Sequence, residues 1–307
     1  MDMQPDELQG NARDIGATVG GSGPKITTVA DVDVDRFERQ KRIGGWSQEK
    51  IARSVALVAG AGALGNEIVK NLVLLGIGKI YLIDFDYVVT SNLSRCIFFR
   101  QSDSRRRSLK AEVVSKRAER VTKDTRIVPL CEDLENLDKK IYKQIDVAFG
   151  ALDNLAARIQ LNIDCYYNRV PLVDGGMEGL QGQVQVVIPP DTPCLCCSLT
   201  EKDWDIIWSR LSCTGPIGER KMPAISTTTS IISAIQVQEA LKIIFGIEDY
   251  RKNKKWDEFF GEPLFGKRLF YAGAPEVLRI YEISKNEKCY VCGPVERKEN
   301  QESKKSD

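Results

Sequence analysis

The sequence feature that most constrains the fold is a glycine-rich turn between an apolar strand and a helix. The apolar run 54–59 (SVALVA) has the length and composition of a strand that is covered on both faces of a sheet. It leads into a GxGxxG pattern whose glycines are Gly60, Gly62 and Gly65. Apolar residues then recur at helical spacing until Gly76, and the segment 79–84 (KIYLID) predicts the next buried strand. This order predicts a parallel βαβ unit.

The same glycines predict a nucleotide site. The first permits a tight turn, the second lets backbone N–H groups approach a phosphate, and the third allows the helix to pack closely on the strand. Asp84 ends the second strand, nineteen residues after Gly65, where a carboxylate can accept hydrogen bonds from ribose hydroxyls. The pattern favours a nucleotide site over a structural turn, but it does not separate NAD from ATP.

The alternation of strands and helices continues along the chain and predicts an α/β fold with a doubly wound sheet. We expect helices over 109–121 and 155–167, and strands over 126–131, 145–151 and 171–176. The alternating run 180–189 predicts an antiparallel strand, 227–245 a long amphipathic helix, and 269–283 a hairpin. Polar composition predicts a flexible tail over 1–33 and a disordered one over 294–307, which leaves 34–293 as one domain.

Composition excludes several classes of function. With 44 basic and 43 acidic residues, the chain has no overall field with which to hold nucleic acid or an anionic membrane. No apolar run is long enough to span a membrane, and polar residues interrupt the helix over 227–245. The chain has no histidine, so catalytic triads, Cys-His pairs and imidazole metal ligands are excluded. Any metal ion must be bound by cysteine, aspartate or glutamate.

Nine cysteines without a secretory leader favour a reducing, cytoplasmic location. Two C-x-x-C pairs have the spacing of a tetrahedral zinc site, with a redox dithiol as the weaker alternative. The four ligands would be Cys194, Cys197, Cys289 and Cys292. A zinc ion with four thiolates has no open position, so its role would be structural. Cys196 lies between two ligands as a bystander, and apolar surroundings predict core positions for Cys96, Cys131 and Cys165.

The segment 84–99 is rich in residues suited to phosphate chemistry, and further candidates follow it. These residues are Asp84, Asp86, Asn92, Arg95, Lys110 and Asp153. A reaction at the α-phosphate of ATP needs several cations and a carboxylate for Mg²⁺, whereas an NAD-dependent dehydrogenase has no task for most of them. Asp153 could also be only the N-cap of the helix that follows it.

Five separate motifs resemble those of the ThiF/MoeB-like and ubiquitin-activating (E1-like) enzymes over about 36–293. They are GAGALGNEIVKNL, LIDFDYVVTSNLSRC, LKAE, ALDNLAAR and the two C-x-x-C pairs. The resemblance implies a Rossmann-like mixed sheet, a zinc site and a crossover loop at about 198–224. It implies a dimeric, ATP-dependent adenylyltransferase that acts on the C-terminal glycine of a ubiquitin-like protein ending in Gly-Gly. Since fifteen residues follow Cys292, we expect a minimal, prokaryotic-type activating enzyme without a rhodanese or ubiquitin-fold domain.

The resemblance also implies roles for single residues. It assigns the three glycines to the phosphate loop, Asp84 to the ribose with Asp86 beside it, and Asp153 to Mg²⁺. It assigns the triphosphate to Asn92, Arg95 and Lys110. Arg39, in RFERQ, matches an arginine that reaches the ATP of the neighbouring subunit, so we expect a homodimer, with a heterodimer left open. Cys96 stands where the family usually has glutamine.

Cys213 is followed by Thr214 and resembles the Cys-Thr pair of enzymes that form a thioester after adenylation. Without histidine, its thiolate must be favoured by nearby cations, of which Arg210, Arg220 and Lys221 are close in sequence. We expect ubiquitin-like modifier activation through Cys213, and leave open a conjugating enzyme as second partner. The alternatives are adenylation of a sulfur-carrier protein without an enzyme thioester, an NAD-dependent dehydrogenase and a non-catalytic partner subunit.

Overall fold

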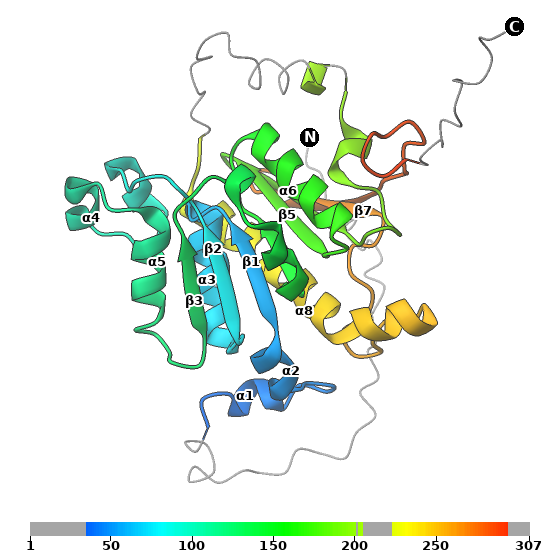
Figure 1. The fold of residues 1–307 in the computed structure, drawn as a ribbon, viewed down its shortest axis with the longest axis horizontal. Coiled ribbons are helices and arrows are strands. Elements are labelled where there is room, and N and C mark those ends of the chain that lie inside the picture. Colours follow the sequence, from blue (N-terminus) through cyan, green and yellow to red (C-terminus); the bar gives the residue numbers. More distant parts are fainter. Residues whose placement is uncertain (1–34, 201, 205–222, 294–307) are drawn as a thin grey trace, which may run out of the picture.

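The computed structural model describes residues 35–200, 202–204 and 223–293 of the 307-residue chain. Its centre is an eight-stranded mixed sheet with the strand order β3-β2-β1-β4-β5-β6-β7-β8 (Figure 1). The sheet has helices on both of its faces, as the sequence predicts. The two predicted tails and most of the predicted crossover segment lie outside the described residues.

The first five strands are parallel and form the half of the sheet that the βαβ pattern predicts. They are β1 (Val55–Ala59), β2 (Lys79–Ile83), β3 (Arg126–Leu130), β4 (Val147–Gly150) and β5 (Leu172–Glu178). The chain moves outward from β1 to β3 and then returns to place β4 on the other side of β1. This reversal between β1 and β4 is where doubly wound sheets hold a ligand beyond the carboxyl ends of the strands.

The other three strands are antiparallel. They are β6 (Gln181–Val187), β7 (Lys267–Ala272) and β8 (Val277–Glu282). The alternation in the sequence of β6 is confirmed as a strand with two faces, because Val184 and Val186 pack into one core while Val187 packs into the other. The hairpin expected over 269–283 is formed by β7 and β8.

Helices cover the two faces and enclose two hydrophobic cores. One face packs against α3 (Ala63–Leu75), α5 (Lys110–Ala118) and α8 (Ser226–Asn253). The other packs against α6 (Leu155–Tyr167) and the 3-10 helices η3 (Leu134–Asn136), η4 (Lys139–Gln144) and η5 (Leu195–Ser198). Alternate residues of β1 divide between the two cores, with Val58 in the first and Leu57 in the second.

Four short helices lie at the ends of the sheet. They are α1 (Glu38–Lys41), α2 (Gln48–Arg53), η2 (Thr90–Ser94) and α4 (Gln101–Arg106). The N-cap of α2 is Ser47, whose hydroxyl accepts a hydrogen bond from the N–H of Lys50 at 3.2 Å. The other three short helices have no apolar periodicity in their sequences.

The long helix α8 continues eight residues beyond the predicted end at Phe245 and closes at Asn253. Gly246 therefore does not terminate the helix. A Cβ at this position would lie 2.8 Å from the ring of Trp256, so the glycine lets that ring pack against the helix. A glycine after the last apolar residue of a predicted helix usually marks its end, but Gly246 is required here by close packing against Trp256.

By length and composition, α8 is the one helix among the described residues that could cross a membrane. However, 67% of its apolar stretch is buried inside the protein. Gln236 and Glu239, on this helix, are also buried and hydrogen-bonded to the backbone of other elements. The helix is therefore part of the core of an α/β fold.

One cysteine prediction is wrong. Cys96 and Cys165 are buried as expected, but Cys131 is exposed. It lies one residue beyond β3, which is one of the two edge strands of the sheet and has only one buried residue, Ile127. An edge strand has a neighbour on one side only, so its apolar sequence does not guarantee burial of the residues that follow it.

Candidate nucleotide and metal sites

The predicted phosphate loop joins β1 to α3. Gly60 has φ +98°, and a Cβ there would lie 2.5 Å from the carbonyl oxygen of Ala151. A Cβ at Gly65 would lie 1.9 Å from the carbonyl oxygen of Gly60, so strand and helix approach each other at these two positions. Gly62 caps α3 without a side-chain hydrogen bond, and its Cα faces open space. The first N–H groups of α3 are therefore placed to bind a phosphate.

A buried asparagine that sequence reasoning missed fixes this loop. Asn66 donates from Nδ2 to the carbonyl oxygens of Ala61 (2.8 Å) and Gly62 (2.9 Å). Its Oδ1 accepts from the N–H of Phe98 at 3.0 Å, which ties the loop to the segment after η2. The only indication in the sequence is a polar residue among the apolar positions of α3.

Asp84 and Lys110 lie close together at the carboxyl end of β2. Asp84 accepts hydrogen bonds from the N–H groups of Ala61 (2.7 Å) and Asp86 (2.8 Å). Burial raises the pKa of Asp84, and the positive charge of Lys110 only partly opposes that effect. Each carboxylate oxygen keeps a further lone pair that can accept a hydrogen bond from a ribose hydroxyl.

Lys110 is the first residue of α5, and its side chain is only 12% exposed. Its Nζ donates to Asp86 at 2.7 Å. Burial alone would lower the pKa of Lys110, but the charges of Asp84, Asp86 and Asp153 outweigh burial and raise it. The site therefore holds a permanent cation among carboxylates, a combination that suits a phosphate group bound together with Mg²⁺.

Asp153 follows the carboxyl end of β4 and is exposed. The N-cap of α6 is not Asp153 but Asn154, whose side chain accepts from the N–H of Ala157 at 2.7 Å. The carboxylate of Asp153 is therefore not used as a helix cap. Gln236 of α8 donates to the carbonyl oxygen of Gly150 at 2.9 Å and so supports the strand end that precedes Asp153.

Two further residues were predicted to bind phosphates: Asn92 lies on η2, and Arg95 is the residue that follows this helix. Asn92 is buried, and its Oδ1 accepts from the N–H of Val89 at 3.1 Å. Arg95 donates to the carbonyl oxygen of Ser91 at 2.6 Å. Burial raises the pKa of the Cys96 thiol to about 11, although the nearby positive charges of Arg95 and Lys110 oppose this effect. Cys96 is therefore a neutral core residue at the position where the resemblance implies glutamine.

Among the described residues predicted to bind ATP, Arg39 is not part of this group. Arg39, on α1, is exposed at the end of the sheet where β1 begins (Figure 1). The neighbouring Gln40 contacts Leu75 at the last turn of α3, whereas Gly62 caps the first. The 13 residues of α3 span about 20 Å, which separates Arg39 from the phosphate loop of its own chain. Cys213 lies outside the described residues.

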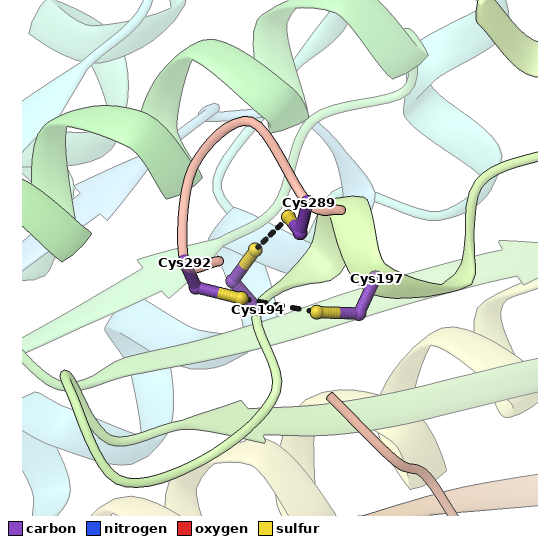
Figure 2. A group of neighbouring side chains, drawn as sticks. All are labelled: Cys194, Cys197, Cys289 and Cys292. Carbon is purple, nitrogen blue, oxygen red and sulfur yellow. Dashed lines mark hydrogen bonds between the residues drawn. The ribbon is translucent and has the colours of Figure 1, made fainter. Parts of the chain in front are cut away.

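The two C-x-x-C pairs come together on the α6 side of the sheet (Figure 2). The Sγ atoms of Cys194 and Cys289 are 3.6 Å apart, those of Cys197 and Cys292 are 3.1 Å apart, and all four lie within 4.8 Å of one another. A tetrahedral zinc ion with Zn–S bonds of 2.3 Å places its sulfur atoms about 3.8 Å apart. The four side chains therefore fit a zinc ion.

Buried hydrogen bonds hold the first cysteine pair in place. Asn162 of α6 accepts from the N–H of Leu195 at 3.0 Å and donates to the Sγ of Cys196 at 3.7 Å. Cys196 is buried and is not one of the four clustered cysteines, although its thiol contacts that of Cys194. A zinc ion held here would stabilise the link between η5 and the turn that follows β8 by binding the four thiolates.

We predict about one zinc ion per chain in the purified protein, bound by these four cysteines. Replacing Cys194 or Cys289 with serine removes a ligand and is expected to lower the zinc content below a third of the wild-type value. Elemental analysis measures it, with Cys131→Ser as the control because Cys131 is exposed and distant in sequence from both pairs. Unchanged zinc in both ligand variants would contradict the assignment.

The fold is that of a Rossmann-like protein with a four-cysteine cluster and a group of polar residues at the carboxyl ends of β1, β2 and β4. The ThiF family model matches residues 35–302, and the chain belongs to the ThiF family. This family membership places it among the E1-like adenylyltransferases and agrees with the five motifs described above.

Individual relatives differ in length. The chain is 33% identical over 162 residues to a ubiquitin-activating enzyme E1-like protein of Saccharomyces cerevisiae, a match over 52% of this chain and 25% of the yeast protein. It is 27% identical over 273 residues to the molybdopterin-synthase adenylyltransferase of Escherichia coli, over 87% of this chain and 100% of that protein. Among solved structures, Escherichia coli MccB matches 84% of this chain and 74% of its own, with a TM-score of 0.66 and 18% identity, which supports the fold alone.

Proposed function

We propose that the protein uses ATP to adenylate the C-terminal glycine of a ubiquitin-like protein and then accepts the acyl group on Cys213. The adenylation step is supported by one observation: the glycine loop, Asp84, Lys110 and Asp153 lie close together at the carboxyl ends of the parallel strands. These groups come from the ends of β1, β2 and β4 and from the start of α5, so the fold holds them in fixed positions.

The chemistry proposed for this site is an in-line displacement at phosphorus. An oxygen of the glycine carboxylate attacks the α-phosphate of ATP, the bond to the β-phosphate breaks, and pyrophosphate leaves with the bonding electron pair. Lys110 and Arg95 offset the charge that develops on the phosphate oxygens, and Asp153 provides a ligand for the Mg²⁺ that accompanies ATP. The product is an acyl-adenylate, a mixed anhydride with AMP as its leaving group.

The charge at the site favours a further cation from outside the chain. Asp84, Asp86 and Asp153 surround Lys110, so carboxylates outnumber the lysine at the strand ends. A triphosphate would add negative charge even when it is bound together with Mg²⁺. We propose that Arg39 of a second copy supplies this cation in a homodimer, since Arg39 of the same chain is at the opposite end of α3.

The second step would transfer the acyl group from the adenylate to Cys213. The thiolate attacks the carbonyl carbon, AMP leaves with the bonding electron pair, and a thioester remains. This proposal rests on the Cys-Thr pair in the sequence and on the 33% identity to the yeast E1-like relative. The alternative, adenylation of a sulfur-carrier protein without the enzyme thioester, is supported by the full-length match to the molybdopterin-synthase adenylyltransferase.

Exchange of labelled pyrophosphate into ATP tests the adenylation step, because exchange requires the reversible formation of the acyl-adenylate. We expect exchange to depend on a ubiquitin-like protein that ends in Gly-Gly and to be absent when the final glycine is removed, since the attacking carboxylate is then displaced. The test protein is a ubiquitin-like protein from the same genome. Exchange that is equally fast without any acceptor protein, or absent with every Gly-Gly protein of that genome, would contradict the proposal.

A further inference from the structure

The helix α1, which carries Arg39, is too short to be stable by itself. α1 has four residues, and its N-cap, Phe37, makes no side-chain hydrogen bond. An isolated helix of this length is not stable in water, because one turn does not compensate the entropy lost in forming it. The place of Arg39 is therefore set by contacts between α1 and the rest of the protein.

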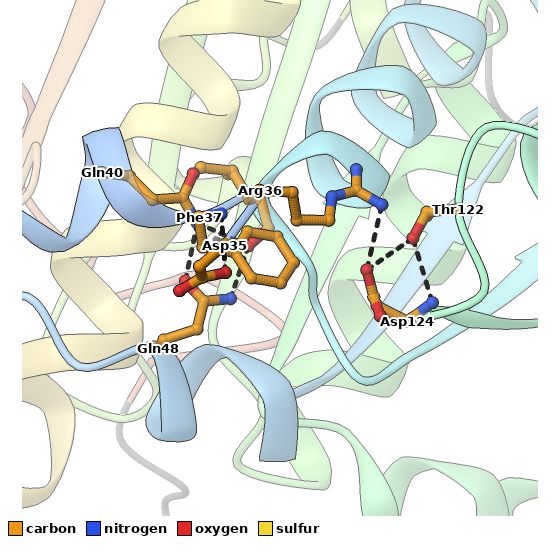
Figure 3. Close-up of polar contacts among 8 residues, drawn as sticks. Asp35, Arg36, Phe37, Gln40, Gln48, Thr122 and Asp124 are labelled. Atoms are coloured by element: carbon orange, nitrogen blue, oxygen red, sulfur yellow. Dashed lines mark hydrogen bonds and ion pairs between the residues drawn. The ribbon is translucent and has the colours of Figure 1, made fainter. Parts of the chain in front are cut away.

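The most directional of these contacts is made by Gln40, next to Arg39. Its Nε2 donates to the Oε1 of Gln48 at 2.6 Å and to the carbonyl oxygen of Leu75 at 3.0 Å (Figure 3). Gln48 donates to the same carbonyl oxygen at 3.0 Å and accepts from Nε1 of Trp46 at 3.0 Å. We call Gln40, Gln48 and the carbonyl group of Leu75 the glutamine clasp. It occupies a carbonyl at the last turn of α3 that has no partner within the helix.

The residues just before α1 make further contacts, but these restrict the position of the helix less than the glutamine clasp does. The ring of Phe37 lies over Gly76, where a Cβ would be 2.5 Å from the ring and φ is +78°. Arg36 pairs with Asp124 at 2.9 Å, as Figure 3 also shows, but their side chains are 37% and 45% exposed. An ion pair with this exposure contributes little because water screens it. The clasp is thus the partly buried connection closest to Arg39.

We propose that Gln40 is a positioning residue for Arg39 in the active site of the neighbouring subunit, an inference that rests on the function proposed above. Adjacent residues of a helix point about 100° apart, so fixing Gln40 toward α3 directs Arg39 away from it. This agrees with their burial, since Gln40 is half-buried and Arg39 is exposed. Gln40 belongs to one chain and acts on the reaction of the other.

Replacing Gln40 with alanine is expected to lower pyrophosphate exchange by roughly ten- to a hundredfold, because a displacement of about 1 Å in a charged group can have that effect. Gln48→Glu is expected to have a smaller effect, since a carboxylate still accepts from Gln40 and Trp46. Gln40→Glu removes both donated hydrogen bonds and should resemble Gln40→Ala. The control is Arg53→Ala on α2, whose side chain is 79% exposed and pairs only with Glu49 among the described residues.

Mixed dimers, purified with two different tags, separate positioning from a general loss of structure. In the first arrangement, one chain carries Gln40→Ala and the other Asp153→Ala. In the second, one chain carries both changes and the other is wild type. The positioning role predicts about half the wild-type exchange for the first arrangement, because one of two sites is complete, and the low rate of Gln40→Ala for the second. A role within its own chain predicts the reverse.

A companion mixture of Arg39→Ala with Asp153→Ala chains tests the action of Arg39 on the neighbouring site separately from the positioning role of Gln40. If this mixture recovers exchange activity but the two Gln40 arrangements give the reverse of the expected rates, only the positioning role of Gln40 is overturned. No recovery, despite proven mixed dimers, overturns the action of Arg39 on the neighbouring site and the inference with it. A monomer by light scattering has the same consequence. An unfolding midpoint for Gln40→Ala within a few degrees of wild type, with lost exchange, supports positioning.

Discussion

Asp153→Ala and Lys110→Ala are each expected to reduce pyrophosphate exchange by roughly a hundredfold or more, as loss of a preorganised charge commonly does. Asp153 is not the cap of α6, so its removal should take away a ligand for Mg²⁺ and leave the helix formed. Lys110 lies 12% exposed among carboxylates, so its removal leaves their negative charge uncompensated where the triphosphate would bind. The exchange assay with the cognate ubiquitin-like protein measures both effects.

Matched controls are available for both variants. Lys116 lies on the same helix as Lys110 but is exposed, and Asp249 is an exposed carboxylate on α8. Alanine at either position should leave exchange within about twofold of wild type, because a surface charge far from the site is screened. Near-normal exchange in both site variants, or an equal loss in the controls, would refute the roles assigned to Asp153 and Lys110.

The thioester should disappear completely in Cys213→Ala. Incubation of the enzyme with ATP, Mg²⁺ and the modifier should give a conjugate on a non-reducing gel that a thiol reagent removes. The alanine variant should lose this band and keep pyrophosphate exchange, since adenylation precedes transfer and uses other residues. Cys131→Ala is the matched control, because Cys131 is an exposed thiol whose pKa is raised by partial desolvation and by the nearby Glu112.

The opposite outcomes identify the alternative function. If wild type forms no thiol-sensitive conjugate with a modifier that supports exchange, the reaction stops at the acyl-adenylate. This is the outcome expected of a sulfur-carrier adenylyltransferase. A conjugate that persists in Cys213→Ala and is lost in Cys131→Ala would move the acceptor thiol to the edge of the sheet.

The parallel half of the fold could be predicted because its strands are buried on both faces and its helices have one apolar stripe. The glycine loop, Asp84 and the end of β4 follow from local sequence in the same way. The position of Cys131 could not be predicted, since strand order decides which strand is at the edge. Nor could the continuation of α8 through Gly246, which depends on Trp256, a residue ten positions further along the chain.

The residues that hold the site in place were the hardest to find. Asn66, Gln236 and Gln40 act through hydrogen bonds to backbone groups of other elements. Sequence shows each of them only as a polar residue, and polar residues in helices are usually solvated. Their partners become visible only when the strand ends and helix ends are arranged in space. The nucleotide-facing residues carry a motif, whereas the supporting residues do not.

The order of strands in the sheet has a consequence for synthesis on the ribosome. Strand β6 receives its outer neighbour only when β7 emerges, 80 residues after Val187. At a usual elongation rate this interval lasts roughly 4 to 16 s. During that time the N–H and C=O groups along one side of β6 have no strand beside them, next to the apolar side chains of Val184 and Val186. Strand β1 waits even longer for its second neighbour, since β4 begins 88 residues after Ala59. β1 and β6 are therefore the inner strands most open to pairing with another chain before synthesis is complete.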